Sequence, residues 1–64
     1  MKVGPRIRRL REARQLSQTA LARKAKVGRI TLLRIEQGSQ DPTLGTLERL
    51  ARALRVKLRD LIPD

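Results

Sequence analysis

Apolar side chains recur at helical spacing along most of this sequence, in segments separated by turn-forming residues. In the first segment Ile7, Leu10 and Ala13 lie three residues apart, as one face of a helix does. Pro5 suits the first turn of a helix, because its missing N–H would be unpaired there in any case. The pattern therefore predicts a first helix over about residues 5–14.

Two shorter helical segments follow, over Gln18–Ala25 and Arg29–Gln37. Ser17 suits the N-cap of the first, and Gly38 suits the end of the second, because glycine adopts left-handed backbone without strain. The residues of this pair that we expect to be buried are Ala22, Val27, Leu32 and Ile35. Two short helices joined by about three residues predict a helix-turn-helix unit over about residues 18–37.

A fourth segment has the clearest apolar face, and Thr43 suits its N-cap. Its apolar residues at helical spacing are Leu44, Leu47, Leu50, Ala51 and Leu54. A last helical turn or two is expected from about Leu58 to Ile62. The chain shows no strand-like alternation of useful length, no internal repeat and no flexible linker. We therefore expect an all-α fold, a compact bundle of five short helices in one domain over residues 1–64.

Composition narrows the range of functions. The 64 residues include no Cys, no His and no aromatic side chain, so a thiolate nucleophile, an imidazole base and the usual zinc ligands are missing. We therefore expect no metal, no cofactor, no evident small-molecule ligand and no enzymatic activity. Proteins that hold single-stranded nucleic acid on aromatic rings are a poor match for the same reason.

The charge of the chain points to a polyanionic partner. It carries 16 Lys and Arg against 6 Asp and Glu, a formal charge of +10. This excess favours phosphate backbones through counterion release, although a general surface bias toward Arg would give the same composition. Apolar runs are too short for a membrane span or a signal peptide, so we expect a cytoplasmic protein with no membrane partner.

Short motifs along the chain sharpen this expectation. They are Leu-Ser-Gln at 16–18, Leu-Ala at 21–22, Arg-Ile-Glu-Gln-Gly at 34–38, Pro-Thr-Leu at 42–44 and Leu-Ala-Arg-Ala-Leu at 50–54. With them, residues 7–62 resemble the Cro and phage-repressor type of helix-turn-helix proteins, the XRE-like family of small DNA-binding regulators. The resemblance implies a lambda-repressor-like domain, bacterial or phage-encoded, that binds double-stranded DNA in the nucleoid.

The resemblance assigns base contacts to the third predicted helix. Arg29, Ile30, Leu33 and Arg34 match the positions that face base edges in the major groove. Each Arg can form a bidentate pair with guanine, typically worth ~1–3 kcal/mol of discrimination per base pair. The two apolar residues are unusual, because the family places small or polar side chains there. They would contact thymine methyls, turn into the core or bind a protein partner.

Other positions match the phosphate-contacting residues of the family, namely Gln18, Thr31, Ser39, Gln40 and Thr43. Gln18 begins the second helix, whose positive end favours an anion, and Thr43 also suits a plain N-cap. Arg11 and Glu36 match a structural pair that joins the first helix to the end of the third. As a partly exposed pair it would contribute only ~1 kcal/mol while holding the third helix at its angle.

Several residues depart from the family pattern. Lys26 stands where a turn glycine is usual, so it would hold left-handed backbone at a cost of ~1 kcal/mol. Arg55 replaces another turn glycine. Gly28 replaces the hydroxyl residue that caps the third helix, and Ala20 leaves Ser17 without the acidic partner of a capping box.

Oligomeric state follows from the small size of one recognition helix. Because such a helix reads few base pairs, proteins of this type commonly bind pseudo-palindromic sites as twofold dimers, and we expect a homodimer. Leu58 and Ile62 are the interface candidates, with Val56 and Leu61 completing the core. Core packing without a dimer is the alternative. The chain is either a complete Cro-like repressor or the DNA-binding part of a longer one.

Three functions fit these observations. The first is sequence-specific binding of double-stranded DNA as a transcriptional regulator, a repressor that occupies a promoter. The second is a protein-interaction module of the same fold, which binds a toxin, polymerase or phage factor through Ile30 and Leu33. The third is non-specific packaging of the nucleoid by charge alone.

Overall fold

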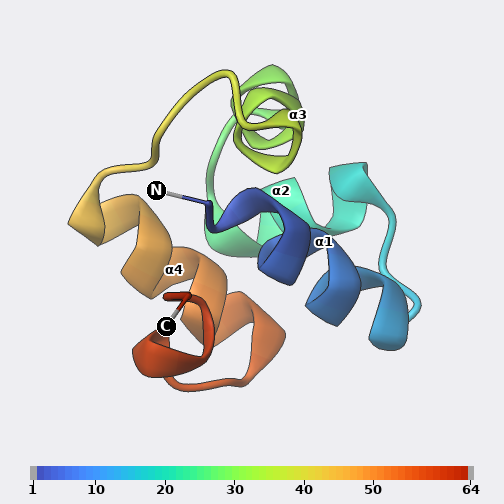
Figure 1. The fold of residues 1–64 in the computed structure, drawn as a ribbon. Helices are drawn as coiled ribbons and strands as arrows, with labels where there is room; N and C mark the ends of the chain where they lie inside the picture. The colour runs from blue at the N-terminus through green and yellow to red at the C-terminus, as the bar shows by residue number, and fades with distance from the viewer. Residues whose placement is uncertain (1, 64) are drawn as a thin grey trace.

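The computed structural model describes residues 2–63, over which the chain forms four α-helices and a short 3-10 turn (Figure 1). The elements are α1 (Gly4–Ala13), α2 (Gln18–Ala25), α3 (Arg29–Gln37), α4 (Leu44–Leu54) and η1 (Leu58–Asp60). The all-α prediction is confirmed, and the bounds predicted for the second and third helices are those observed. The first helix begins and ends one residue earlier than predicted.

The prediction of five helices was wrong at the last element, which is a single 3-10 turn. The Lys57 N–H donates to Asp60 Oδ2 at 2.9 Å, and the Asp60 N–H donates back to Lys57 O at 2.9 Å. The backbone bonds that follow also span three residues rather than four. This tight bonding, with Pro63 lacking an N–H just beyond, prevents a longer helix.

The helices leave one side of α3 uncovered. α2 packs against both α3 and α4, and α1 packs against α3 and α4 (Figure 1). In Figure 1, α3 is seen end-on at the upper edge of the molecule, and α4 crosses the lower left. The core therefore holds α3 from one side only.

In the part of the chain that is described, no helix is long and apolar enough to cross a membrane.

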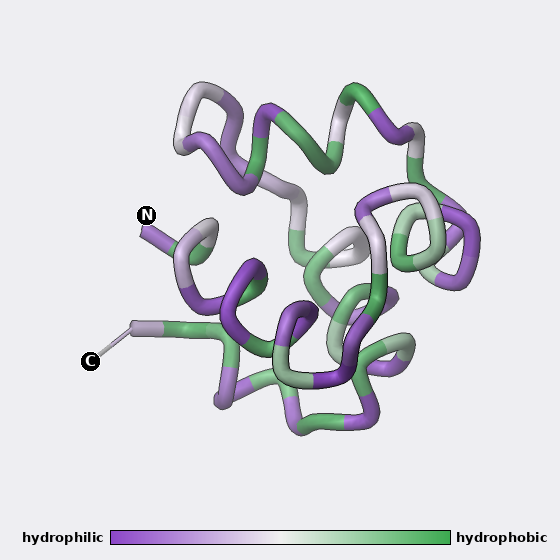
Figure 2. The backbone as a smooth tube through the Cα atoms, turned by 90° about the vertical axis from the view of Figure 1, so that its right-hand side faces the viewer, coloured by the Kyte–Doolittle hydropathy of each residue, from purple (hydrophilic) through white to green (hydrophobic). Residues whose placement is uncertain are grey.

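The core is entirely aliphatic. Its buried members are Val3, Ile7, Leu21, Ala22, Ala25, Leu32, Ile35, Leu47, Leu50, Ala51, Leu54 and Leu61. Apolar and hydrophilic stretches alternate along the tube in Figure 2, and each of the four α-helices contributes buried residues to this cluster. Two positions predicted on buried faces are exposed, Ala13 at the end of α1 and Leu44 at the start of α4. Both lie at a helix terminus, beyond the stretch that packs against the core.

Gly4 allows α1 to approach α3 closely. A Cβ at this position would meet the carbonyl oxygens of Ile35 and Glu36, the latter at 2.7 Å. Atoms this close repel one another, so a larger residue would separate the two helices. Val3, next to it, is only 1% exposed and was not predicted as a core residue.

The helix caps follow the predicted positions. The Ser17 hydroxyl oxygen accepts from the Ala20 N–H at 3.0 Å, and that of Thr43 accepts from the Thr46 N–H at 3.1 Å. Gly28 is the N-cap of α3 and supplies no side-chain cap, and Gly38 is its C-cap, in left-handed backbone at φ 82°.

Three non-glycine residues also have left-handed backbone, namely Gln15, Lys26 and Arg55, with φ values of 56°, 57° and 58°. Lys26 is the C-cap of α2 and Arg55 is the C-cap of α4, positions where glycine is the favoured residue. The positive φ predicted for Lys26 is therefore confirmed. Each such residue costs about 1 kcal/mol relative to glycine, because its Cβ approaches the following carbonyl oxygen.

Candidate nucleic-acid interface

The uncovered side of α3 presents Arg29, Ile30 and Arg34 to solvent. Leu32 and Ile35, on the opposite side, are 0% and 1% exposed and anchor the helix in the core. Ile30 is 47% exposed. Within the described part of the chain, neither arginine side chain makes a hydrogen bond or ion pair, so both guanidinium groups are available to a ligand.

Leu33 differs from Ile30 in its surroundings. It is half-buried and lines a hollow of about 270 Å³. The other residues around this hollow are Arg8, Arg11, Gln18, Glu36 and Gln37. Leu33 therefore lies beside the junction of α1, α2 and α3, and of the two apolar residues only Ile30 is exposed on the open side of α3.

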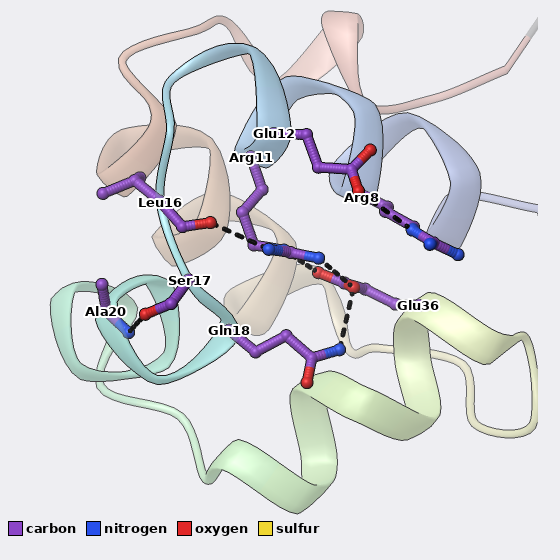
Figure 3. A network of polar contacts seen from close by, with 8 residues as sticks. All are labelled: Arg8, Arg11, Glu12, Leu16, Ser17, Gln18, Ala20 and Glu36. Atoms are coloured by element: carbon purple, nitrogen blue, oxygen red, sulfur yellow. Dashed lines mark hydrogen bonds and ion pairs between the residues drawn. The ribbon is translucent and has the colours of Figure 1, made fainter.

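A polar network fixes this junction (Figure 3). Arg11 donates from Nε to Glu36 Oε2 at 2.7 Å and from Nη2 to Glu36 Oε1 at 3.1 Å, and its Nη1 donates to Leu16 O at 2.8 Å. The Arg11 and Glu36 side chains are only 11% and 3% exposed. The pairing implied by the family resemblance is present, but it is far more buried than the partly exposed pair that we expected. Hydrogen bonding to Glu36 raises the pKa of Arg11 above its ordinary value, against the opposing effect of burial.

The same carboxylate holds Gln18, the first residue of α2. Gln18 Nε2 donates to Glu36 Oε1 at 3.1 Å, and Figure 3 shows the amide turned toward α3. A glutamine amide carries two N–H donors, of which Glu36 takes one. The second donor remains, on a side chain whose orientation Glu36 sets, at the positive end of a helix.

The remaining phosphate candidates lie in different settings. Ser39 bonds to the end of α3, its hydroxyl donating to Arg34 O at 3.3 Å. Thr43 is the N-cap of α4, and its hydroxyl also bonds to Thr46 Oγ1 at 3.0 Å. Gln40 is exposed in the loop between α3 and α4, and Thr31 is half-buried on α3. Thr43 therefore has the N-cap role that the sequence analysis gave as its alternative. The loop and the start of α4 follow α3 directly in the chain.

Besides the bond between Gln18 and Glu36, sequence reasoning missed a polar contact between α2 and α4. Arg49 of α4 donates from Nε to Ala25 O, the carbonyl at the last residue of α2, at 3.2 Å. The contact spans 24 residues, so no local pattern indicates it. It supplies one of the hydrogen bonds that a helix C-terminus otherwise lacks.

The C-terminal segment, residues 56–62, contains both the predicted dimer-interface residues and the residues predicted to complete the core, and these residues differ in burial. Leu61 is 0% exposed, as predicted, whereas Val56 and Leu58 are half-buried against the core cluster. Ile62 is 38% exposed. Val56 and Leu58 also line a shallow hollow of about 300 Å³ with Glu48, Ala51 and Arg52.

These features define a helix-turn-helix protein, in which a central helix supports a second, outward-facing one across a tight turn. The chain belongs to the Helix-turn-helix family, whose match covers residues 7–61. The resemblance to Cro and phage-repressor proteins is thereby confirmed.

Curated relatives include two phage repressors. The chain is 40% identical over all of its 64 residues to the immunity repressor protein of Bacillus phage phi105, covering 44% of that protein. It is 41% identical over 59 residues, 92% of the chain, to the cryptic phage CTXphi transcriptional repressor RstR of Vibrio cholerae, covering 53% of that protein. The chain therefore spans about half the length of these relatives.

Two solved structures have nearly the same fold. One is the restriction-modification controller protein C.AhdI from Aeromonas hydrophila, with a TM-score of 0.93 and 36% identity over 95% of this chain and 92% of that one. The other is in a complex of the SinR and SinI proteins, with a TM-score of 0.92 and 32% identity, covering 97% of this chain and 61% of that one.

Proposed function

We propose that this chain binds double-stranded DNA at specific sequences, with α3 in the major groove, and acts as a transcriptional repressor by occupying a promoter. The observation that carries the proposal is the pair of unpartnered arginines, Arg29 and Arg34, on the open side of a helix that Leu32 and Ile35 anchor in the core. Two repressors among the relatives and the controller protein with the same fold support it.

In this proposal, one group of residues contacts the bases and another group contacts the phosphates. Arg29, Ile30 and Arg34 face the bases, and Leu33 fills the edge of the interface beside Gln18. Gln18, Thr31, Ser39, Gln40 and Thr43 contact phosphates, with the N–H groups at the starts of α2 and α4. These phosphate contacts fix how the protein sits on the duplex, and the arginines supply the preference among sequences.

The protein acts as a homodimer on a pseudo-palindromic site, because one recognition helix contacts too few base pairs to be selective. Leu58 and Ile62 form the interface. Its place of action is the cytoplasm, on the bacterial nucleoid.

Selection from randomised duplexes at about 150 mM salt tests the proposal, because non-specific binding weakens steeply with salt. We expect an enriched motif with twofold symmetry. Arg29→Ala and Arg34→Ala should each remove the preference at one base position per half-site, at a cost of ~1–3 kcal/mol. Arg9→Ala, a matched exposed arginine on α1, should weaken all sequences alike and leave the motif unchanged. Recovery of no motif would refute sequence-specific binding.

The exposed Ile30 favours a second candidate, a protein-interaction module that binds an acidic protein through α3. One of the two similar structures belongs to a complex of two proteins. Under this function, Ile30→Ala and Leu33→Ala would weaken partner binding more than Arg29→Ala or Arg34→Ala. Under simple nucleoid packaging, the two arginine variants would instead weaken all DNA sequences equally.

A further inference from the structure

A second concentration of positive charge lies apart from α3. A hollow of about 480 Å³ is lined by five cationic residues, Lys24, Lys26, Arg49, Arg52 and Arg55, and we call it the cationic hollow. Its other lining residues are alanines, and no acidic residue lines it among the described residues.

The cationic hollow and the candidate interface lie at opposite ends of the same two helices. Gln18 and Thr43 mark the N-terminal ends of α2 and α4, whereas Lys26 and Arg55 mark the C-terminal ends. At 1.5 Å per residue, the 8 residues of α2 span roughly 12 Å and the 11 residues of α4 roughly 16 Å. The cationic hollow is therefore a separate surface, and not an edge of the face that α3 presents.

Helix capping explains only part of this charge. Cations stabilise helix C-termini, and Arg49 does so directly by donating to Ala25 O. The two helix ends together present about one negative charge, however, against five positive side chains. Lys24, Lys26, Arg52 and Arg55 make no side-chain hydrogen bond or ion pair within residues 2–63, so a large positive excess remains without a partner in the fold.

Two of the five cations occupy positions that work against stability. Lys26 and Arg55 have nearly the same left-handed backbone, with φ and ψ of 57° and 44° and of 58° and 41°. Glycine would adopt this conformation without strain at both positions. Strained residues that carry unpartnered charge into a shared hollow indicate a function for that charge.

We propose that the cationic hollow binds the phosphate backbone of a second DNA duplex, so that one protein molecule holds two duplex segments at once. The proposal rests on the proposed function, since α3 holds the first duplex. Phosphates fit because the hollow offers lysine and arginine donors, while the described chain supplies no aromatic ring for stacking bases and only alanine as apolar lining. Binding at this surface is independent of sequence, because charge and donors alone recognise phosphate.

A capture experiment tests this. An immobilised duplex carrying the enriched site is loaded with protein, and the bound protein is measured. A fluorescent duplex of unrelated sequence is then added at about 150 mM salt, and the captured fluorescence is measured as salt is varied. We expect the loaded wild-type protein to capture the second duplex, with affinity that falls steeply as salt rises.

The decisive variant is Lys26→Gly with Arg55→Gly, which removes two charges and relieves two strained residues. We expect this variant to melt at a higher temperature than the wild type, and the amount of it bound to the first duplex to be within about twofold of wild type. Its affinity for the second duplex should fall about tenfold, and the slope of log affinity against log salt concentration should become shallower by about 1.8. Lys24→Gln with Arg52→Gln, which leaves the left-handed residues in place, should show the same loss of capture.

Two controls separate the effects of strain and of net charge. Gln15→Gly relieves the same backbone strain without removing charge, and should capture normally. Arg14→Gln with Arg59→Gln removes two exposed charges outside the cationic hollow, and should retain capture within about twofold. Loaded wild-type protein without capture, or an equal loss in the charge control, would refute the proposal. A failure of wild-type protein to load would instead refute the proposed function.

Discussion

Arg11 and Glu36, which lie 25 residues apart, are joined by two hydrogen bonds in an almost fully buried ion pair. The pair connects α1 to α3, and Glu36 Oε1, which accepts from Arg11 Nη2, also accepts from Gln18 Nε2 at the start of α2. The Glu36 carboxylate therefore sets both the angle of the proposed recognition helix and the direction of the Gln18 side chain, which is proposed to contact a phosphate. Substitutions at Glu36 and at Gln18 should separate its effect on stability from its effect on DNA binding.

We expect Glu36→Ala to lower the free energy of unfolding by about 3 kcal/mol or more, because it leaves the Arg11 guanidinium buried without its partner. Urea unfolding followed by circular dichroism measures the difference. Arg8→Ala is the matched control, since Arg8 pairs with Glu12 at 3.5 Å in an exposed i,i+4 pair and should cost under about 0.5 kcal/mol. Equal losses in the two variants would contradict a special role for the buried pair.

The contribution of Arg11 should not change across neutral pH. Hydrogen bonding to Glu36 raises the pKa of Arg11, so its stabilisation is fully present below the ordinary arginine pKa and is lost only as pH rises through the raised value. The difference in unfolding free energy between wild type and Arg11→Ala should therefore be constant from about pH 6 to pH 9. A drift above about 1 kcal/mol over that range would contradict this assignment.

Gly4→Ala should lower the free energy of unfolding by about 2 kcal/mol, because the added methyl group meets backbone carbonyls of α3 that cannot move aside. Gly45→Ala is its control within α4. A Cβ there has only the Thr43 hydroxyl nearby at 3.9 Å, so better helix propensity should stabilise the protein by up to about 1 kcal/mol. Thermal melting of both variants checks the opposite signs, and a neutral Gly4→Ala would show that α1 can shift without cost.

Gln18→Ala should weaken binding to all duplexes by about tenfold and leave the sequence motif unchanged, because a phosphate contact carries no base information. Fluorescence anisotropy with the enriched site and with an unrelated duplex measures both effects. Thr19→Ala, at the next exposed position of α2, is the matched control. A change in base preference, or no change in affinity, would remove Gln18 from the phosphate contacts.

Ile62→Asp should dissociate the proposed dimer without unfolding the subunit, because Ile62 is 38% exposed and a surface substitution typically changes stability by under about 0.5 kcal/mol. Sedimentation velocity should show a smaller species, and affinity for the palindromic site should fall. Leu44→Asp, at a 61% exposed residue on α4, should leave the sedimentation coefficient unchanged. If the wild-type protein sediments as a monomer at the concentration that saturates the site, the dimer is not the binding form.

The helices were predictable from sequence because their signals are local. Ser17 and Thr43 cap, Gly38 terminates, and the apolar faces repeat within each segment. The periodic signal was weakest at the ends of elements. Leu44 continues the apolar spacing of α4 but is exposed, because it does not pack against the core. The last segment is a 3-10 turn, in which the Asp60 carboxylate accepts from the backbone N–H of Lys57.

By itself, then, the sequence determined the four α-helices and the helix-turn-helix, because each depends on spacing within a few residues. Only the tertiary structure decided how buried the Arg11–Glu36 pair is, why residue 4 is glycine and where Leu33 lies. It also brought the cations at the ends of α2 and α4 into one hollow. These relationships join residues that belong to different helices, and they depend on helix packing angles that no local pattern encodes.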